Sequence, residues 1–254
     1  MRRALLIFLT FLTVGVSFQS CKKDINTDNE TTFRTADKFD SQVVIEWNNI
    51  WLEIERYAAG YRPCPTANAL GYVGLANYEA CITGMPENAS LAKLYNGLNI
   101  PAAFTNQEYH WPTVVNAVNY YLYSRLLPEV ESSLYSKIGA LANKNEKLFQ
   151  EQISQDVFLR SKNHGEAVAA AVWDWMKSDA VTFDGYKDPF KDNNWQDRLN
   201  EPGAWTPTSP GPGQGMFPYW GKARTLAIKD DLKVCKPYTY YVGTYSEEPG
   251  SALY

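Results

Sequence analysis

Residues 65–86 constrain the fold more than any other stretch, because they combine helix signals with small side chains. Pro65 suits the first turn of a helix, where its missing N–H is no loss, and Gly84 with Pro86 two residues later marks the end. A glycine inside a helix costs about 1 kcal/mol relative to alanine. We therefore expect a central, buried helix that needs its small residues for close contact with other helices. These residues are Ala67, Ala69, Gly71, Gly74, Ala76 and Ala80.

Two amphipathic helices are predicted on either side of this stretch. Over residues 43–57 apolar side chains recur every three or four positions, which is the period of a helix with one buried face. A second stripe of this kind begins at Trp111-Pro112 and ends before Pro128. The first buried face is predicted to contain Val43, Val44, Trp47, Ile50, Trp51, Ile54 and Tyr57, and the second Val114, Val115, Val118, Tyr121, Leu122 and Leu126.

Residues 130–179 continue the helical pattern. They predict either two helices or one long broken helix, with a kink at His164-Gly165. Residues 89–109 predict a connection that contains one short helix. The chain is thus predicted to be all-α, with a helical bundle over residues 41–180.

Residues 181–254 differ in character, because repeated prolines and glycines exclude long helices. We expect a long Pro/Gly/Trp-rich loop laid over the bundle, in which tryptophans cover apolar helix surface. Lys222 and Arg224 are weak candidates for contact with an anion, and the alternative is that they are surface charges at the end of a packed loop. The prolines are Pro189, Pro202, Pro207, Pro210, Pro212, Pro218 and Pro237.

The N-terminus predicts export. Residues 1–20 have the pattern of a signal peptide, with Arg2 and Arg3 before an apolar run that is too short to span a bilayer comfortably. The run ends just before Cys21, which we expect to carry a lipid; the alternative is cleavage by an ordinary signal peptidase that leaves Cys21 unmodified. Residues 21–40 are polar and predict a flexible tether.

Charge and cysteine spacing exclude several classes. The net charge is −4 and no basic cluster is present, so a nucleic-acid partner is not expected. Cys64 and Cys81 lie at opposite ends of one predicted helix, roughly 25 Å apart, which is too far for a disulfide. Cys235 can pair with only one of them, so at least one thiol stays free. No Cys/His spacing suggests zinc, and we predict no metal ligand.

Five sequence blocks occur in a characteristic order: Glu-Trp-Asn at 46–48, Ala-Gly-Tyr-Arg-Pro at 59–63, Ala-Leu-Gly-Tyr-Val-Gly-Leu-Ala-Asn-Tyr-Glu-Ala at 69–80, Gly-Met-Pro at 84–86 and Tyr-His-Trp-Pro at 109–112. Together they resemble the N-terminal half of the vanadium-dependent haloperoxidase and PAP2-type acid phosphatase superfamily, and in particular its lipoprotein branch in certain Gram-negative bacteria. The resemblance runs over residues 43–254. It implies an all-α fold, haloperoxidase or phosphatidic acid phosphatase-type phosphomonoesterase activity in the intact family, bound vanadate or phosphate, and a lipid anchor in the outer membrane on its periplasmic or cell-surface side.

The catalytic motifs of that family are not matched. The family binds its oxyanion with one Lys, two Arg, a Pro-Ser-Gly-His loop and a second histidine. In this chain His110 precedes a helix as a capping or core residue, and His164 lacks the Pro-Ser. Arg160 stands two residues too close to His164 for the Arg-to-His motif, and Glu55 replaces the lysine expected before Arg62. We therefore predict no catalytic residue, and no cofactor bound by this chain alone.

The resemblance accordingly implies a chain that stops before the catalytic half. Residues 245–254 resemble the opening of the family's next helix. We expect a scaffold, inactive alone, whose partner is the missing C-terminal half, and whose uncovered helix faces favour a homodimer. The alternative is a surface lipoprotein that binds glycans or other nutrients through its Trp/Tyr-rich loop, since the chain has 17 Tyr and 8 Trp.

Overall fold

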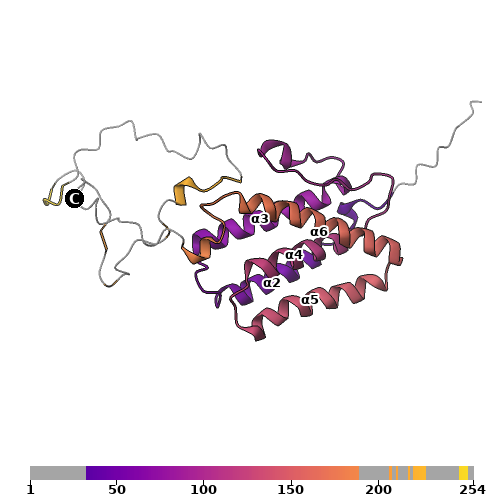
Figure 1. The fold of residues 1–254 in the computed structure, drawn as a ribbon, viewed down its shortest axis with the longest axis horizontal. Helices are drawn as coiled ribbons and strands as arrows, with labels where there is room; N and C mark the ends of the chain where they lie inside the picture. Colours follow the sequence, from indigo (N-terminus) through magenta and orange to yellow (C-terminus); the bar gives the residue numbers. More distant parts are fainter. Residues whose placement is uncertain are drawn as a thin grey trace, which may run out of the picture. The chain divides into compact units, whose positions relative to one another are not determined.

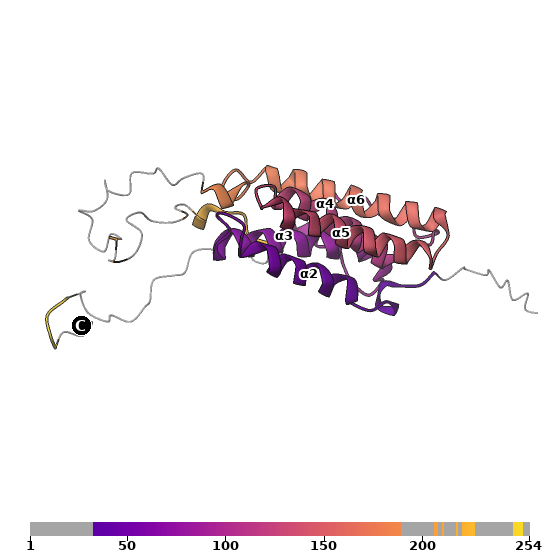
Figure 2. The same ribbon diagram turned by 90° about the horizontal axis from the view of Figure 1, so that it is seen from below.

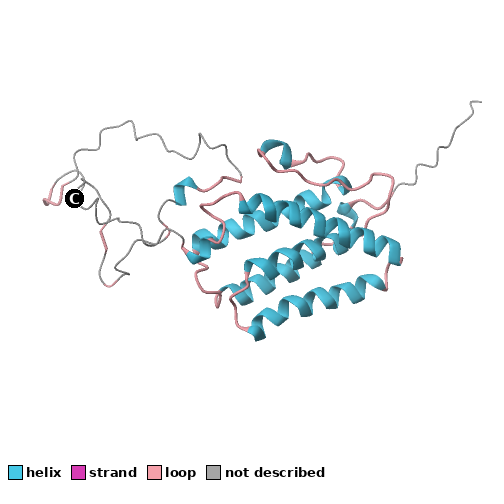
Figure 3. Ribbon diagram, viewed as in Figure 1, coloured by secondary structure: helices cyan, strands magenta, loops and turns pink. Residues whose placement is uncertain are grey.

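Five α-helices make up the bundle in the described part of the chain (Figures 1 and 3). The computed structural model describes residues 33–188, 206–207, 210, 217, 220–226 and 246–250. Short 3₁₀ helices connect or follow the long ones, and the described residues contain no strand, which confirms the all-α prediction. The α-helices are α2 (Gln42–Glu55), α3 (Pro63–Cys81), α4 (Trp111–Leu126), α5 (Ser132–Gln150) and α6 (Gln155–Lys177). The 3₁₀ helices are η1 (Ala36–Lys38), η2 (Ile82–Gly84), η3 (Leu91–Leu94), η4 (Gly185–Lys187) and η6 (Trp220–Lys222).

Helix α4 is the centre of the bundle. It packs against α2, α3, α5 and α6, and Figure 2 shows it among them. Eleven of its sixteen residues are buried, on more than one face and including the polar Thr113, Asn116 and Asn119, so the single buried face predicted from the sequence is too narrow. Helix α3 is also largely buried and packs against α4 and α6.

The two glycines of α3 have different surroundings from those predicted. A β-carbon added to Gly71 would stand 2.6 Å from Cδ1 of Leu226, so this glycine admits a loop residue rather than a helix. No described atom lies within 4 Å of the same position on Gly74. The prediction that both glycines serve close helix packing is therefore wrong.

The C-terminal part of the bundle forms two helices, which confirms the first of the two alternatives. The chain turns just before Ser154, whose hydroxyl caps α6 by accepting a hydrogen bond from the Val157 N–H at 3.3 Å. Helix α6 continues through His164 and Gly165, so neither residue ends the helix, and the kink predicted there stays a prediction. Gly165 is required instead by α4, since a β-carbon there would stand 2.4 Å from the carbonyl oxygen of Val114.

Aromatic side chains fill the centre of the bundle. Trp47 and Trp51 of α2 both meet Tyr123 of α4 edge to face, with ring centroids 5.2 and 5.1 Å apart. The indole N–H of Trp47 donates to the Asn116 side-chain oxygen at 3.0 Å, so a buried polar group is satisfied. Tyr57, predicted on this buried face, is 63% exposed because α2 ends at Glu55.

Cys64 and Cys81 lie at the two ends of α3 and do not pair with each other, as their spacing predicted, and both thiols are free. No helix in the described ranges is long and apolar enough to cross a membrane. The predicted signal peptide, Cys21, most of the predicted tether and Cys235 lie outside the described residues.

Candidate functional site

Arg224 joins the loop region to the end of α6. Its Nη1 donates to the carbonyl oxygen of Trp175 at 2.8 Å, and its Nη2 donates to the Ser178 hydroxyl at 2.7 Å. The guanidinium carbon lies 4.0 Å from the centroid of the Trp175 ring, which adds a cation–π contact. Nη1 also approaches the Tyr72 hydroxyl at 3.4 Å. These contacts make Arg224 a clamp between loop and bundle.

Asp179 accepts hydrogen bonds from the turn that follows it and from the backbone of Arg224. One carboxylate oxygen accepts from the Thr182 hydroxyl at 2.7 Å and from the Arg224 N–H at 2.9 Å, while the other accepts from the Val181 N–H at 3.2 Å. The side chain is buried, and three donors compensate its desolvation. Sequence reasoning missed Asp179, because its partner Arg224 is 45 residues away.

Lys222 is exposed on η6, beside Trp220. The anion contact suggested for Lys222 and Arg224 stays a prediction; the geometry shows Arg224 engaged with the bundle. Trp220 covers Gly185 of η4, where an added β-carbon would stand 3.0 Å from the indole. Binding of a glycan by this loop also stays a prediction, since most of its aromatic residues lie outside the described part.

The two histidines belong to the core. His110 immediately precedes α4, and its Nδ1 is 2.8 Å from the Thr113 hydroxyl. Burial, with the charge of Arg34, lowers the pKa of His110 to about 4. Nε2 of His164 is 2.9 Å from the carbonyl oxygen of Ala80 on α3, and burial lowers its pKa as well. Both imidazoles are therefore neutral at pH 7.

The charged residues and histidines considered as site candidates do not converge on one site. Trp175, which Arg224 covers, lies eleven positions after His164 on α6, roughly 16 Å along the helix axis. Glu55 accepts a hydrogen bond from the Thr66 hydroxyl at 2.8 Å, and Arg62 donates to its neighbour's carbonyl oxygen at 3.0 Å. In the described ranges, no group of three or more His, Cys, Asp or Glu side chains is arranged to hold a metal ion.

Arg160 and His164 do share one surface cavity of about 530 Å³, because four residues bring them to the same face of α6. Tyr109 forms the opposite wall, 5.4 Å from the His164 ring centroid. The Arg160 Nε donates to the Glu108 carbonyl oxygen at 3.0 Å, which directs this guanidinium toward the loop before α4. The arrangement is explained by packing and by one backbone contact.

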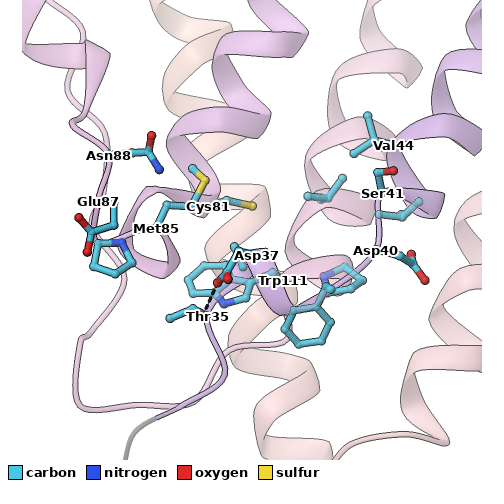
Figure 4. A pocket seen from close by; sticks show the side chains of 16 residues that line it. Thr35, Asp37, Asp40, Ser41, Val44, Cys81, Met85, Glu87, Asn88 and Trp111 are labelled. Carbon is cyan, nitrogen blue, oxygen red and sulfur yellow. Dashed lines mark hydrogen bonds between the residues drawn. The ribbon is translucent and has the colours of Figure 1, made fainter.

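A second cavity, about 650 Å³, lies where η1, the start of α2, the end of α3 and the start of α4 meet (Figure 4). Its walls are mainly apolar and include Val43, Cys81 and Trp111. The polar side chains Asp37, Asp40 and Glu87 also line it. Sequence reasoning missed this site, because four separate segments form it and none carries a recognisable motif.

The geometry described so far defines an all-α bundle with the fold seen in vanadium-dependent haloperoxidases. One solved structure with a similar fold is that of the first bacterial vanadium-dependent iodoperoxidase, with a TM-score of 0.61 and 23% sequence identity. The match covers 84% of this chain and 47% of the iodoperoxidase chain, so this protein spans about half of that length. No family model matches the sequence, and no curated protein matches it.

Proposed function

We propose that this chain is the supporting half of a vanadium haloperoxidase-like protein, and that the oxyanion-binding half of the fold is a separate set of helices. The observation that carries the proposal is the structural match, which includes most of this chain but only 47% of the iodoperoxidase. The bundle would then act as a rigid support, with α4 packed on four sides as its axis.

The side chains of the described part support this division. A bound vanadate or phosphate needs several cations and fixed N–H donors that converge on it. Here the guanidinium of Arg224 donates to the bundle, and His110 and His164 are buried at different contacts. Reactive groups for an oxyanion are thus expected on the second half.

Purified chain offers a direct test. We expect no vanadate binding by ⁵¹V NMR, no peroxide-dependent oxidation of iodide or bromide, and no hydrolysis of a phosphomonoester. In a second experiment, the chain is co-expressed with the polypeptide encoded immediately downstream. We expect the two to form a complex, and we expect vanadate binding or phosphatase activity in the complex only. Turnover by the isolated chain, or failure of the two polypeptides to associate, would overturn the proposal.

We also propose that Cys21 carries a lipid that anchors the exported protein to the outer membrane. Support comes from the apolar run and the cysteine that follows it. Cells grown with labelled palmitate should label the wild-type protein and the Cys64→Ser variant, but not Cys21→Ser. Labelling that persists in Cys21→Ser, or that is absent from the wild type, would contradict the anchor.

A further inference from the structure

The cavity beside η1 has the size and lining of a small-molecule site. Its volume of about 650 Å³ is within the range of cavities that hold drug-sized ligands. Its walls come from segments far apart in sequence, from Thr35 to Val115, so it is a product of the fold rather than of one loop. The oxyanion chemistry proposed above does not involve it.

Its apolar walls are held by specific contacts. Trp111 packs against Gly84, where an added β-carbon would stand 2.3 Å from the indole ring. The Trp111 indole N–H donates to the Arg34 carbonyl oxygen at 3.1 Å, which fixes the ring on its other side. Burial raises the pKa of the Cys81 thiol to about 12, so this wall is neutral at pH 7 and chemically inert.

The polar residues of the cavity give it a negative rim. Asp37 is paired with Lys38 at 2.5 Å, which compensates its charge. Asp40 accepts the Gln42 N–H at 3.0 Å but forms no ion pair with any described residue, and Glu87 has neither a hydrogen bond nor an ion pair within the described ranges. Figure 4 shows Glu87 on one side of the cavity and Asp40 on the other. Among the described residues that line the cavity, none is Lys, Arg or His.

From this combination we propose that the cavity binds an organic ammonium ion, with the apolar body against Trp111 and Val44 and the ammonium group at the rim near Asp40 or Glu87. An apolar body gains free energy by leaving water. The uncompensated carboxylates favour a positive head group over a neutral one and disfavour a negative one. The charge of the rim therefore selects the ligand class, while the walls supply most of the affinity.

The contribution of the rim charge can be separated from that of the apolar walls with three ligands that share the same apolar body: 4-phenylbutylamine, 4-phenylbutanol and 4-phenylbutanoate. Binding to the full chain is measured by saturation-transfer-difference NMR at pH 7. We expect the amine to bind about five-fold more tightly than the alcohol, since exposed charge pairs contribute up to about 1 kcal/mol. The acid should bind most weakly. No saturable binding of the amine, or equal affinity for all three, would overturn the proposal.

Substitutions at the rim test whether its carboxylates cause the preference for the amine over the alcohol. The double variant Asp40→Asn, Glu87→Gln keeps similar side-chain shapes and should reduce the amine-to-alcohol preference to about one, leaving the affinity for the alcohol unchanged. The matched control Glu151→Gln removes an exposed carboxylate outside the cavity and should keep the preference. Val44→Trp, which fills the cavity from its half-buried wall, should abolish binding of all three ligands; circular dichroism establishes that each variant is folded. A preference that survives the double variant, or binding that survives Val44→Trp, refutes the site.

Discussion

Gly165 on α6 lies against the carbonyl group of Val114 on α4 with no room for a side chain between them. An added β-carbon would stand 2.4 Å from the Val114 oxygen and 3.0 Å from the Ala117 β-carbon. The two helices that pack most extensively thus approach each other at a glycine. This contact explains why α6 keeps a residue that disfavours helices.

Replacing Gly165 with alanine should destabilise the protein. The methyl group must push α4 and α6 apart, and such overpacking costs about 1–3 kcal/mol, more than the helix propensity gained. The matched control is Gly139→Ala in α5, where nothing lies within 4 Å of the added carbon and the free energy of unfolding should rise by about 1 kcal/mol. Urea unfolding of both variants checks the prediction, and a stabilised Gly165→Ala would contradict it.

Glu79→Gln should also lower stability. The Glu79 carboxylate is 1% exposed and accepts hydrogen bonds from the Ser90 hydroxyl at 2.8 Å and from the N–H groups of Leu91 and Ala92 at 2.6 and 3.2 Å. Glutamine keeps only one acceptor oxygen, so we expect a loss of about 2 kcal/mol in the free energy of unfolding.

The same denaturation series includes the exposed Glu151→Gln, which should change stability by less than about 0.5 kcal/mol. Equal stabilities for the Glu79 and Glu151 variants would show that the contacts of Glu79 with η3 do not stabilise the fold.

Stability should fall between pH 7 and pH 4.5 in a way that depends on His110. Burial, then the Arg34 charge, lowers the His110 pKa from 6.5 to about 4. In this window the unfolded chain binds a proton at His110 and the folded chain does not, so the free energy of unfolding decreases as pH falls. The lowered pKa of His164 acts in the same direction.

The measurement is the loss of unfolding free energy between pH 7 and pH 4.5, for the wild type and for His110→Gln. The wild type should lose about 2 kcal/mol more, because each pKa unit corresponds to about 1.4 kcal/mol. Titrating carboxylates affect both proteins alike and cancel in the comparison. Equal losses would show that His110 does not titrate differently in the folded and unfolded states.

Arg224→Lys should loosen residues 220–226 while the bundle stays folded. Lysine keeps the charge but cannot donate to Trp175 and Ser178 together in the same planar geometry. Loss of about 1.5–3 kcal/mol of charged hydrogen bonding should accelerate amide hydrogen exchange in this segment about ten-fold or more. Arg56→Lys, at an exposed position after α2, is the control and should leave the exchange unchanged. Unchanged exchange in Arg224→Lys would contradict the clamp.

Much of the bundle is predictable because apolar periodicity is a local signal. The stripe from Val43 to Ile54 predicts α2, and Trp111-Pro112 predicts the start of α4. The role of Gly165 could not be predicted, because a glycine within a helix has the same sequence signature whether it bends the helix or admits a neighbour. Only the position of Val114 across the interface distinguishes the two cases.

Sites built from distant segments gave no comparable signal. Asp179 and Arg224 are separated by 45 residues, and nothing local to either indicates the other. The cavity beside Trp111 depends on η1 and on the chain after α3, whose placement follows from the packing of whole helices. The core position of His110 was predictable, because the residue stands directly before a helix start.

The position of Leu226 has a consequence for assembly. Its side chain lies over Gly71 of α3, and its carbonyl oxygen accepts a hydrogen bond from the Tyr95 hydroxyl. It stands two residues after Arg224, whose guanidinium contacts the end of α6. Polypeptide beyond this point therefore departs from a fixed position on the bundle. A binding module attached there searches a restricted volume around α3, and its effective concentration replaces part of the affinity that two free molecules would need.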